Sequence, residues 1–219
     1  MNIYENRVIA FIDILGFSEV VKNQEKAQLI LNALTEIKKE IDKQFASECF
    51  TKFQGVLDTQ ITAFSDSVVI SGYPSQVMPV YGNACTFSRL LIERGFLCRG
   101  AISVGELYHN NGILFGQAFI DAYNAEKQRA IYPRIILDKE VITLIEDSES
   151  FKNEFLNLIR NDFDNELFID LFKFYEVFMG QGNEVKNKLK EIASPQENHD
   201  KSVAQKINWL INTYKLNEK

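Results

Sequence analysis

The chain has 219 residues, of which 46% are hydrophobic and 25% are charged, and its formal net charge is -6. This is ordinary globular composition, and the length suits one domain or a domain with an extension. The acidic balance and the lack of a dense lysine and arginine run argue against binding along a long nucleic acid, which requires a concentrated positive surface. Small anions held through metal ions are compatible with this charge.

Neither a membrane segment nor a secretion signal is predicted. The longest apolar runs, such as Val8 to Ile12, are far shorter than a bilayer span, and no charged start followed by an apolar stretch opens the chain. The three cysteines are an odd set without CxxC spacing, which indicates neither a disulfide framework nor a zinc site. We therefore expect a cytoplasmic protein with reduced cysteines.

The first predicted elements are a strand and a long helix. Residues 7–12 form a β-branched apolar run that ends in Asp13 and is followed by Gly16, which predicts a buried strand entering a tight turn. Apolar positions between Ala27 and Phe45 recur at helical spacing, with charged residues filling the other positions. This pattern predicts an amphipathic helix.

A hairpin and a second helix are predicted next. The apolar stretches 57–64 and 67–70 are separated by little more than Asp66, which predicts a tight hairpin with an acid at its tip. Helical periodicity returns over 75–94, and Gly95 is suited to end that helix.

The remaining signals describe an α+β protein. The next predicted elements are strands at 96–104 and 106–114, a helix at 116–128, a strand at 133–137 and a short helix at 139–145. This order predicts a mainly antiparallel, ferredoxin-like sheet with helices on one face. We expect a core domain over 1–146 and a mainly helical C-terminal extension over 147–219 packed on it, with a loop at 195–200.

Asp13 is the first candidate for chemistry. An acid that ends a buried strand is costly unless a partner such as a cation neutralises it. Gly16 permits close backbone approach, and Phe17 and Ser18 open a possible helix whose free N–H groups suit phosphate oxygens. Asp66 at the hairpin tip is expected beside Asp13, and such a pair would repel unless metal ions were bound.

Three motifs taken in order resemble those of a known family. FIDILGFS at 11–18, FSDSVVIS at 64–71 and RGAISVG at 99–105 resemble the metal and strand motifs of class III nucleotidyl cyclases. With FGQAFIDAYNAEKQRAIYPRI at 115–135 and QKINWLINTY at 205–214, the pattern resembles the compact bacterial Pycsar pyrimidine cyclases. That resemblance implies an enzyme that converts UTP or CTP into a cyclic signal during phage infection.

The resemblance also implies roles for particular residues. Asp13 and Asp66 are expected to bind two divalent cations, Mn²⁺ or Mg²⁺, with the Ile14 carbonyl as a further ligand. The backbone expected to cradle the β- and γ-phosphates comprises Leu15, Gly16, Phe17 and Ser18. Strand alternation adds Phe11, Thr62 and Phe64 as expected lining of the base or ribose pocket.

Two departures from the family pattern affect substrate and catalysis. Purine cyclases carry a base-reading lysine where this chain has Thr62, so we expect UTP as first choice and CTP as second. Their helical asparagine and transition-state arginine fall on Ile120 and Asn124. Besides Asn124, the candidates to supply catalysis there are Arg99, Lys127, Arg129 and Arg134, with Arg99 and Arg134 preferred because both adjoin predicted strands.

Structural interpretations compete with each of these assignments. Asp13 and Asp66 are also ordinary turn or helix-capping residues, and Arg99 and Arg134 also suit structural salt bridges. His109 and His199 lie in predicted polar turns and are expected to be solvated. The leading hypothesis is a homodimeric cyclase with its site at the interface. The alternatives are a catalytically degenerate, cyclase-like nucleotide-binding or regulatory module, and an interaction scaffold.

Overall fold

A computed structural model describes residues 3–46, 58–149, 152–194 and 201–217. The strands are β1 (Glu5–Ile14), β2 (Gln60–Phe64), β3 (Ser67–Gly72), β4 (Cys98–Asn110), β5 (Ile113–Phe115), β6 (Ile135–Leu137), β7 (Ile159–Asn161) and β8 (Leu167–Ile169). The helices are α1 (Phe17–Val20), α2 (Gln24–Ala46), the short 3₁₀ turn Pro74–Gln76, α3 (Val77–Glu93), α4 (Gln117–Arg129), α5 (Lys139–Glu146), α6 (Lys152–Leu156), α7 (Leu171–Met179), α8 (Gly182–Ala193) and α9 (Lys201–Tyr214).

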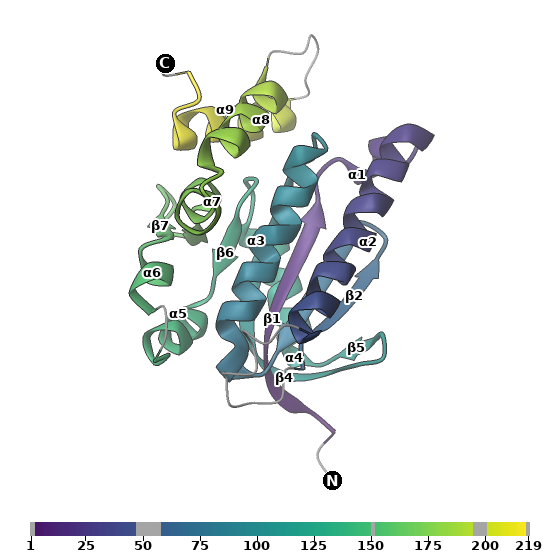
Figure 1. Cartoon of the computed structure of the whole chain (residues 1–219), viewed down its shortest axis with the longest axis vertical. Coiled ribbons are helices and arrows are strands. Elements are labelled where there is room, and N and C mark those ends of the chain that lie inside the picture. Colours follow the sequence, from purple (N-terminus) through teal and green to yellow (C-terminus); the bar gives the residue numbers. More distant parts are fainter. Residues whose placement is uncertain (1–2, 47–57, 150–151, 195–200, 218–219) are drawn as a thin grey trace.

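The sheet confirms the predicted α+β architecture with a ferredoxin-like centre (Figure 1). Its strand order is β2-β3-β1-β4-β6-β8-β7, while β5 pairs only with β4. In the series β2, β3, β1 and β4 each strand is antiparallel to its neighbour, and helical connections follow β1 and β3. Only the β4–β6 pairing is parallel among the pairings within the described residues.

Helices cover both faces of the sheet, so the expectation of helices on one face is wrong for α4. Val8, Ala10 and Ile12 of β1 belong to the large core that α2 and α3 cover. Ile9 and Phe11 point to the opposite face, where they form a smaller cluster with alanines of α4. Because side chains alternate along a strand, β1 is apolar on both faces and is buried between two helical layers.

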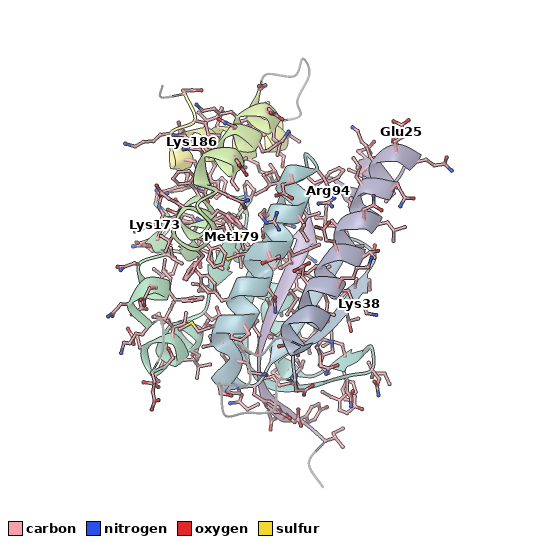
Figure 2. All side chains as sticks on the ribbon, in the orientation of Figure 1. Glu25, Lys38, Arg94, Lys173, Met179 and Lys186 are labelled. Atoms are coloured by element: carbon pink, nitrogen blue, oxygen red, sulfur yellow. The ribbon has the colours of Figure 1, made fainter. Side chains whose placement is uncertain are left out.

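The outer surface of α2 is mainly polar, as the helical pattern predicts, although Leu29 and Leu31 are exposed on it. Figure 2 shows Glu25 and Lys38 on this helix, and both side chains are exposed. Ile30, Ala33 and Ile37 point inward and are buried. The predicted position Phe45 has no described side chain, and residue 57, expected to open the second strand, lies outside the described residues.

Gly100 allows β4 to approach β1 closely beside Asp13. A Cβ atom at this position would lie 2.5 Å from the Phe11 carbonyl oxygen and 3.3 Å from the Ile12 Cα. No larger residue fits without moving one of the two strands. The close approach fixes a register in which Asp13 pairs with Arg99.

β4 runs without a break through Gly105, between the two strands expected at 96–104 and 106–114. It turns into β5 at Asn111 and Gly112, both of which have positive φ values of 51° and 78°. This two-residue connection divides the strand expected at 106–114, and asparagine followed by glycine suits it because both accept positive φ. The hairpin projects beyond β1 toward the side of the sheet on which β2 lies (Figure 1).

The chain after residue 146 contributes strands as well as helices. β7 and β8 form an antiparallel hairpin, and Phe168 of β8 pairs with Ile136 of β6. The sheet therefore continues across the expected boundary at residue 146. The last helix, α9, buries Trp209 and Leu210 against the same core. The expected loop at 195–200 lies outside the described residues.

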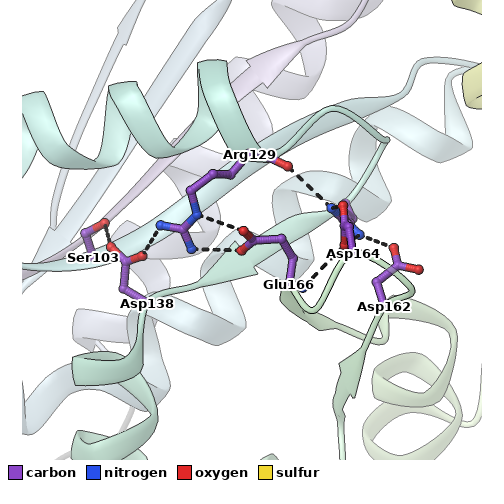
Figure 3. A network of polar contacts seen from close by, with 7 residues as sticks. Ser103, Arg129, Asp138, Asp162, Asp164 and Glu166 are labelled. Atoms are coloured by element: carbon purple, nitrogen blue, oxygen red, sulfur yellow. Dashed lines mark hydrogen bonds and ion pairs between the residues drawn. The ribbon is translucent and has the colours of Figure 1, made fainter.

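A charged network fixes this C-terminal part to the sheet. Arg129 lies between Asp138 and Glu166, at 2.7 Å from Asp138 Oδ1 and 2.8 Å from Glu166 Oε2 (Figure 3).

A second arginine of this network, Arg134, is completely buried and bonds to Asp162 and Asp164. Its guanidinium also packs against rings of Tyr132, Phe168 and Trp209, at 5.3, 5.8 and 5.9 Å from their centroids. Trp209 Nε1 in turn donates to Asp162 at 2.7 Å.

We predict that Arg134→Met lowers the free energy of unfolding by about 3–5 kcal/mol, because it removes a completely buried cation and leaves the partly buried Asp162 without its ion pair. Urea denaturation followed by tryptophan fluorescence measures the change at Trp209. Lys22→Met removes one member of an exposed pair with Glu19 and should change stability by less than about 0.5 kcal/mol. An equally small effect of Arg134→Met would contradict a structural role for this network.

Candidate active site

The tip of the β2–β3 hairpin lies beside the C-terminal end of β1. The last pair in the β1–β3 register is Asp13 with Ser67, and the Ile14 N–H donates to the Asp66 carbonyl at 2.8 Å. Ser65, just before Asp66, has a positive φ of 54°, which accommodates the tight reversal. This backbone geometry brings the two aspartates predicted from sequence to one edge of the sheet.

The two carboxylates interact directly. Burial raises the pKa of Asp13 above its usual value, and the negative charge of Asp66 raises it further. A side-chain hydrogen bond with Asp66 adds to the increase, whereas the positive charge of Arg99 opposes it. Two partly buried acids in contact disfavour each other's ionised form, and a cation between them would remove that penalty.

Arg99 joins Asp13 to a third acid, Glu126 of α4. Arg99 Nε lies 3.5 Å from Asp13 Oδ2 and 2.6 Å from Glu126 Oε1. Neither Arg99 Nε nor Glu126 Oε1 has a well-aligned hydrogen bond among the described residues, so this contact is a close ion pair. Glu126 is only 3% exposed, and burial raises its pKa to about 7 against the opposing charge of Arg99.

Glu126 was missed from the sequence, although its helix carries a signal. Ala118, Ala122 and Ala125 are buried against the sheet, and Glu126 follows Ala122 at the helical spacing of four. An acid on the alanine face of a helix is therefore an acid directed at the sheet. Local sequence gives no indication of which strand residue it meets, because Arg99 lies on β4.

The segment 15–18 retains only part of the expected phosphate cradle. The Leu15 N–H already donates to the Leu97 carbonyl at 2.9 Å, so it is not free to bind phosphate. Gly16 has a φ of 74° and precedes α1, in which the first N–H bonded within the helix is that of Glu19. The N–H groups of Phe17 and Ser18 precede that bond and have no partner inside the helix.

An aromatic cluster lies on the same face of the sheet as Asp13. Phe11 contacts Phe64, Phe119 and Tyr123 at centroid distances of 6.4, 5.9 and 5.6 Å. Phe11 is buried beneath these rings, whereas Phe64 and Tyr123 remain 41% and 40% exposed. Of the predicted pocket residues, Phe64 and the half-buried Thr62 therefore offer surface to a ligand, and Phe11 supports them.

The α4 residues at the positions of the missing family side chains point outward. Asn124 is exposed, and Ile120 is 49% exposed. Neither belongs to the helix face that packs on the sheet, which is formed by the buried alanines and Glu126. Asn124 is therefore placed to act only on a molecule or chain that covers α4.

The structure corrects the expectation for Arg134. Its guanidinium is completely buried and is held by Asp162, Asp164 and three aromatic rings, so it is not available to a phosphate. Arg129 is likewise engaged by Asp138 and Glu166, while Lys127 lies exposed over the Tyr123 ring. Of the two preferred arginines, only Arg99 lies at the aspartate pair.

The donor set fits a hard divalent cation. Carboxylates of Asp13 and Asp66 and the nearby Ile14 carbonyl are oxygen ligands, which Mg²⁺ and Mn²⁺ prefer. Across the described residues no group of three or more His, Cys, Asp or Glu side chains is arranged to hold a metal ion by itself. Mg²⁺ is commonly bound by one or two carboxylates together with substrate phosphates and water, so a pair is sufficient.

We predict that Glu126 makes the metal-free protein less stable as the pH rises. Its folded pKa of about 7 lies above its ordinary value of 4.5, so its contribution to stability is complete below pH 4.5 and is lost as the pH rises through 7. Glu126→Gln should raise the unfolding free energy at pH 8 by on the order of 2 kcal/mol and have little effect near pH 4.5.

Urea denaturation with a chelator present measures this difference at the two pH values. Glu140→Gln, which changes an exposed acid on α5, is the matched control and should show no such pH dependence. A Glu126→Gln protein that is less stable than the unsubstituted chain at pH 8 would contradict the assigned burial penalty.

No family model and no curated protein sequence matches the chain. Solved structures do share its fold. A bacterial light-regulated adenylyl cyclase matches with a TM-score of 0.51 and 15% identity over 84% of this chain and 98% of that chain. A second structure of that description gives 0.53 and 14% identity, over 84% of this chain and 58% of the other.

A guanylyl cyclase is also similar. The catalytic core of a rhodopsin-guanylyl cyclase with converted specificity, solved with ATPαS, matches with a TM-score of 0.50 and 13% identity over 66% of this chain and 82% of that chain. No helix within the described ranges is long and apolar enough to cross a membrane.

The three similar structures show that the chain has the fold of class III nucleotidyl cyclase domains, as its motifs predict.

Proposed function

We propose that the protein is a metal-dependent nucleotide cyclase whose reaction centre is the Asp13–Asp66 pair. The observation that carries this proposal is the meeting of two acids from different strand ends on a sheet with the cyclase fold. The direct interaction of the carboxylates leaves an excess of negative charge that divalent cations would neutralise. A buried turn residue or helix cap would not require a second acid beside it.

The proposed reaction forms a 3′,5′-cyclic nucleotide and pyrophosphate. The ribose 3′-oxygen forms a bond to the α-phosphorus, the bond from that phosphorus to the oxygen bridging to the β-phosphate breaks, and the hydroxyl proton is lost. Two bound divalent cations would supply activation of the hydroxyl and stabilisation of the phosphoryl charge. Asp13 and Asp66 hold the cations, and the free N–H groups of Phe17 and Ser18 suit the outer phosphates.

Arg99 is the proposed replacement for the missing transition-state cation. It is the arginine in contact with Asp13, and Glu126 holds its guanidinium at 2.6 Å. Binding of a cation by Asp13 would weaken its attraction for Arg99 while the pair with Glu126 stays in place. A guanidinium held in this way is preorganised to stabilise developing phosphoryl charge.

We propose a pyrimidine triphosphate as substrate, UTP before CTP, and a role in antiphage signalling. Thr62 stands where purine cyclases carry a base-reading lysine, and the motifs resemble those of Pycsar cyclases. Thr62 and Phe64 lie on the Asp13 face of the sheet and remain accessible.

We also propose a homodimer in which α4 covers the site of a second copy. Phe64, Ile120 and Tyr123 form an exposed apolar stripe beside the aspartates, and each is at least 40% exposed. A second copy would bury this stripe and bring Asn124 to the partner's triphosphate. This accounts for why Asn124 points away from its own aspartate pair.

A nucleotide-binding module without turnover is the second candidate. The observation in its favour is that Ile120 and Asn124 replace the asparagine and arginine of active cyclases. Such a protein would bind a triphosphate with Mn²⁺ and release no pyrophosphate.

We predict that the purified protein with Mn²⁺ forms a cyclic product and pyrophosphate from UTP and, more slowly, from CTP. Asp66→Asn should reduce the rate by at least roughly 100-fold, because it removes a cation ligand. Chromatography of the products with all four triphosphates measures the activity. Asp147→Asn, at an exposed acid at the end of α5, is the control.

The outcomes separate the two candidates. Triphosphate binding without product for any of the four nucleotides would exclude the enzyme and favour the binding module. Unchanged binding and turnover in Asp66→Asn would exclude both, because each requires the aspartate pair.

We predict that Ile120→Glu shifts the protein from dimer to monomer in sedimentation velocity experiments and lowers activity in parallel. A charge in the centre of the apolar stripe would have to be buried on association. Ile131→Glu changes an isoleucine that is 46% exposed just beyond α4 and serves as the control. A monomeric unsubstituted protein with full activity would contradict the dimer.

A further inference from the structure

His109 is buried next to the predicted base-reading residue, contrary to the expectation that it is solvated. It is 3% exposed, because the end of β4 places it on the Asp13 face of the sheet rather than in the turn. Its Nε2 lies 2.9 Å from Thr62 Oγ1, and its Nδ1 lies 2.8 Å from Ser71 Oγ. The histidine therefore links β4 to both strands of the β2–β3 hairpin.

The chain of contacts continues to a buried arginine. Arg7 Nε donates to Ser71 Oγ at 3.1 Å, and the other end of its guanidinium bonds to Asp58 at 2.8 Å. Arg7 and Ser71 are both completely buried. Burial and the nearby charge of Arg7 lower the pKa of His109 to about 4, against the opposing effect of Asp58, so the ring is neutral near pH 7.

Arg7, at the buried end of this series of hydrogen bonds, sets the positions of the hydrogens along it. Arg7 is a donor only, so Ser71 accepts from it and retains one hydroxyl hydrogen to donate. Among the described residues the acceptor that Ser71 Oγ contacts is His109 Nδ1. If Nδ1 instead carried the proton, the Ser71 hydrogen would be buried without a partner, which is costly.

Neutral His109 therefore has its proton on Nε2 and donates it to Thr62. The Thr62 oxygen then acts as acceptor toward the protein, and its hydroxyl hydrogen remains available to a ligand. In the opposite tautomer, with the proton on Nδ1, Thr62 would donate its hydroxyl hydrogen to His109 Nε2 and could only accept hydrogen bonds from a ligand. His109 thus decides whether Thr62 has a hydroxyl hydrogen to donate to a ligand.

We propose that His109, oriented by Arg7 and Ser71, is a positioning residue that makes Thr62 select uracil over cytosine. This rests on the proposed function, in which Thr62 faces the base. The two pyrimidines share the 2-carbonyl, and at the 4-position uracil has a carbonyl acceptor where cytosine has an amino donor. The Thr62 hydroxyl hydrogen can pair with the 4-carbonyl of uracil, whereas the amino group of cytosine can donate only to the one lone pair of Thr62 Oγ1 that His109 leaves free.

The test compares kcat/KM for UTP and CTP, with dissociation constants from calorimetry in Mn²⁺ as a second readout. The unsubstituted protein should prefer UTP. Thr62→Val should lower kcat/KM for UTP by about tenfold and change that for CTP by less than about twofold, because one oriented hydrogen bond is lost. Thr62→Ser keeps the hydroxyl and should retain the preference.

The decisive variants act at a distance from the base. His109→Phe and Ser71→Ala should each reduce the ratio of kcat/KM for UTP to kcat/KM for CTP, as Thr62→Val does. Tyr108→Phe removes a hydroxyl from the neighbouring position of β4 and should leave the ratio unchanged. Circular dichroism melting identifies any variant that fails to fold, and Ser71→Ala is the milder substitution.

Two results would overturn the inference. One is a preference for CTP in the unsubstituted protein, and the other is a ratio that survives both Thr62→Val and His109→Phe. Failure of the proposed function is distinguishable, because it appears as absent turnover of every triphosphate. The ratio of the UTP and CTP dissociation constants still decides the role of His109 in that case.

Discussion

The negative charge of Asp13, at the end of the central buried strand, is the constraint around which this structure is arranged. β1 pairs with β3 on one side and β4 on the other, and its residues from Arg7 to Ile12 are almost completely buried. Asp66 adds a second negative charge to the same edge, while Arg99 supplies a positive one that it shares with Glu126. The edge therefore carries more acid than base, which suits a cation-binding site and is unfavourable for a purely structural core.

The remainder of the fold holds this edge rigid and leaves it accessible. Gly100 permits the close β1–β4 approach that places Arg99 opposite Asp13. Glu126 lies on the buried side of α4 and contacts Arg99 on the face of the sheet that α4 covers. Arg134 attaches the C-terminal part to the sheet through ion pairs with the β7–β8 hairpin and packing against Trp209 of α9. Aromatic side chains around Phe11 cover the face, and Phe64 and Tyr123 remain exposed at its edge, where we propose that a second copy docks.

The sequence was most informative where local pattern decides structure. An apolar strand that ends in Asp13 and a hairpin tip at Asp66 are both local signals, and the predicted convergence of these acids is what the fold produces. Glu126 and His109 were missed or misplaced because their burial depends on contacts with distant strands. The expectation for Arg134 fails for the same reason, since its partners Asp162 and Asp164 lie 28 and 30 residues further along the chain, where local pattern gives no pairing.

The central claim is that Asp13 and Asp66 form a two-cation site for a nucleoside triphosphate. Its most direct test is a Mn²⁺ titration followed by electron paramagnetic resonance, with a non-hydrolysable UTP analogue present. The account predicts two bound Mn²⁺ ions per chain, with binding lost or greatly weakened in Asp13→Asn and Asp66→Asn. Undiminished Mn²⁺ binding in both variants, or no binding in the unsubstituted protein, would contradict it.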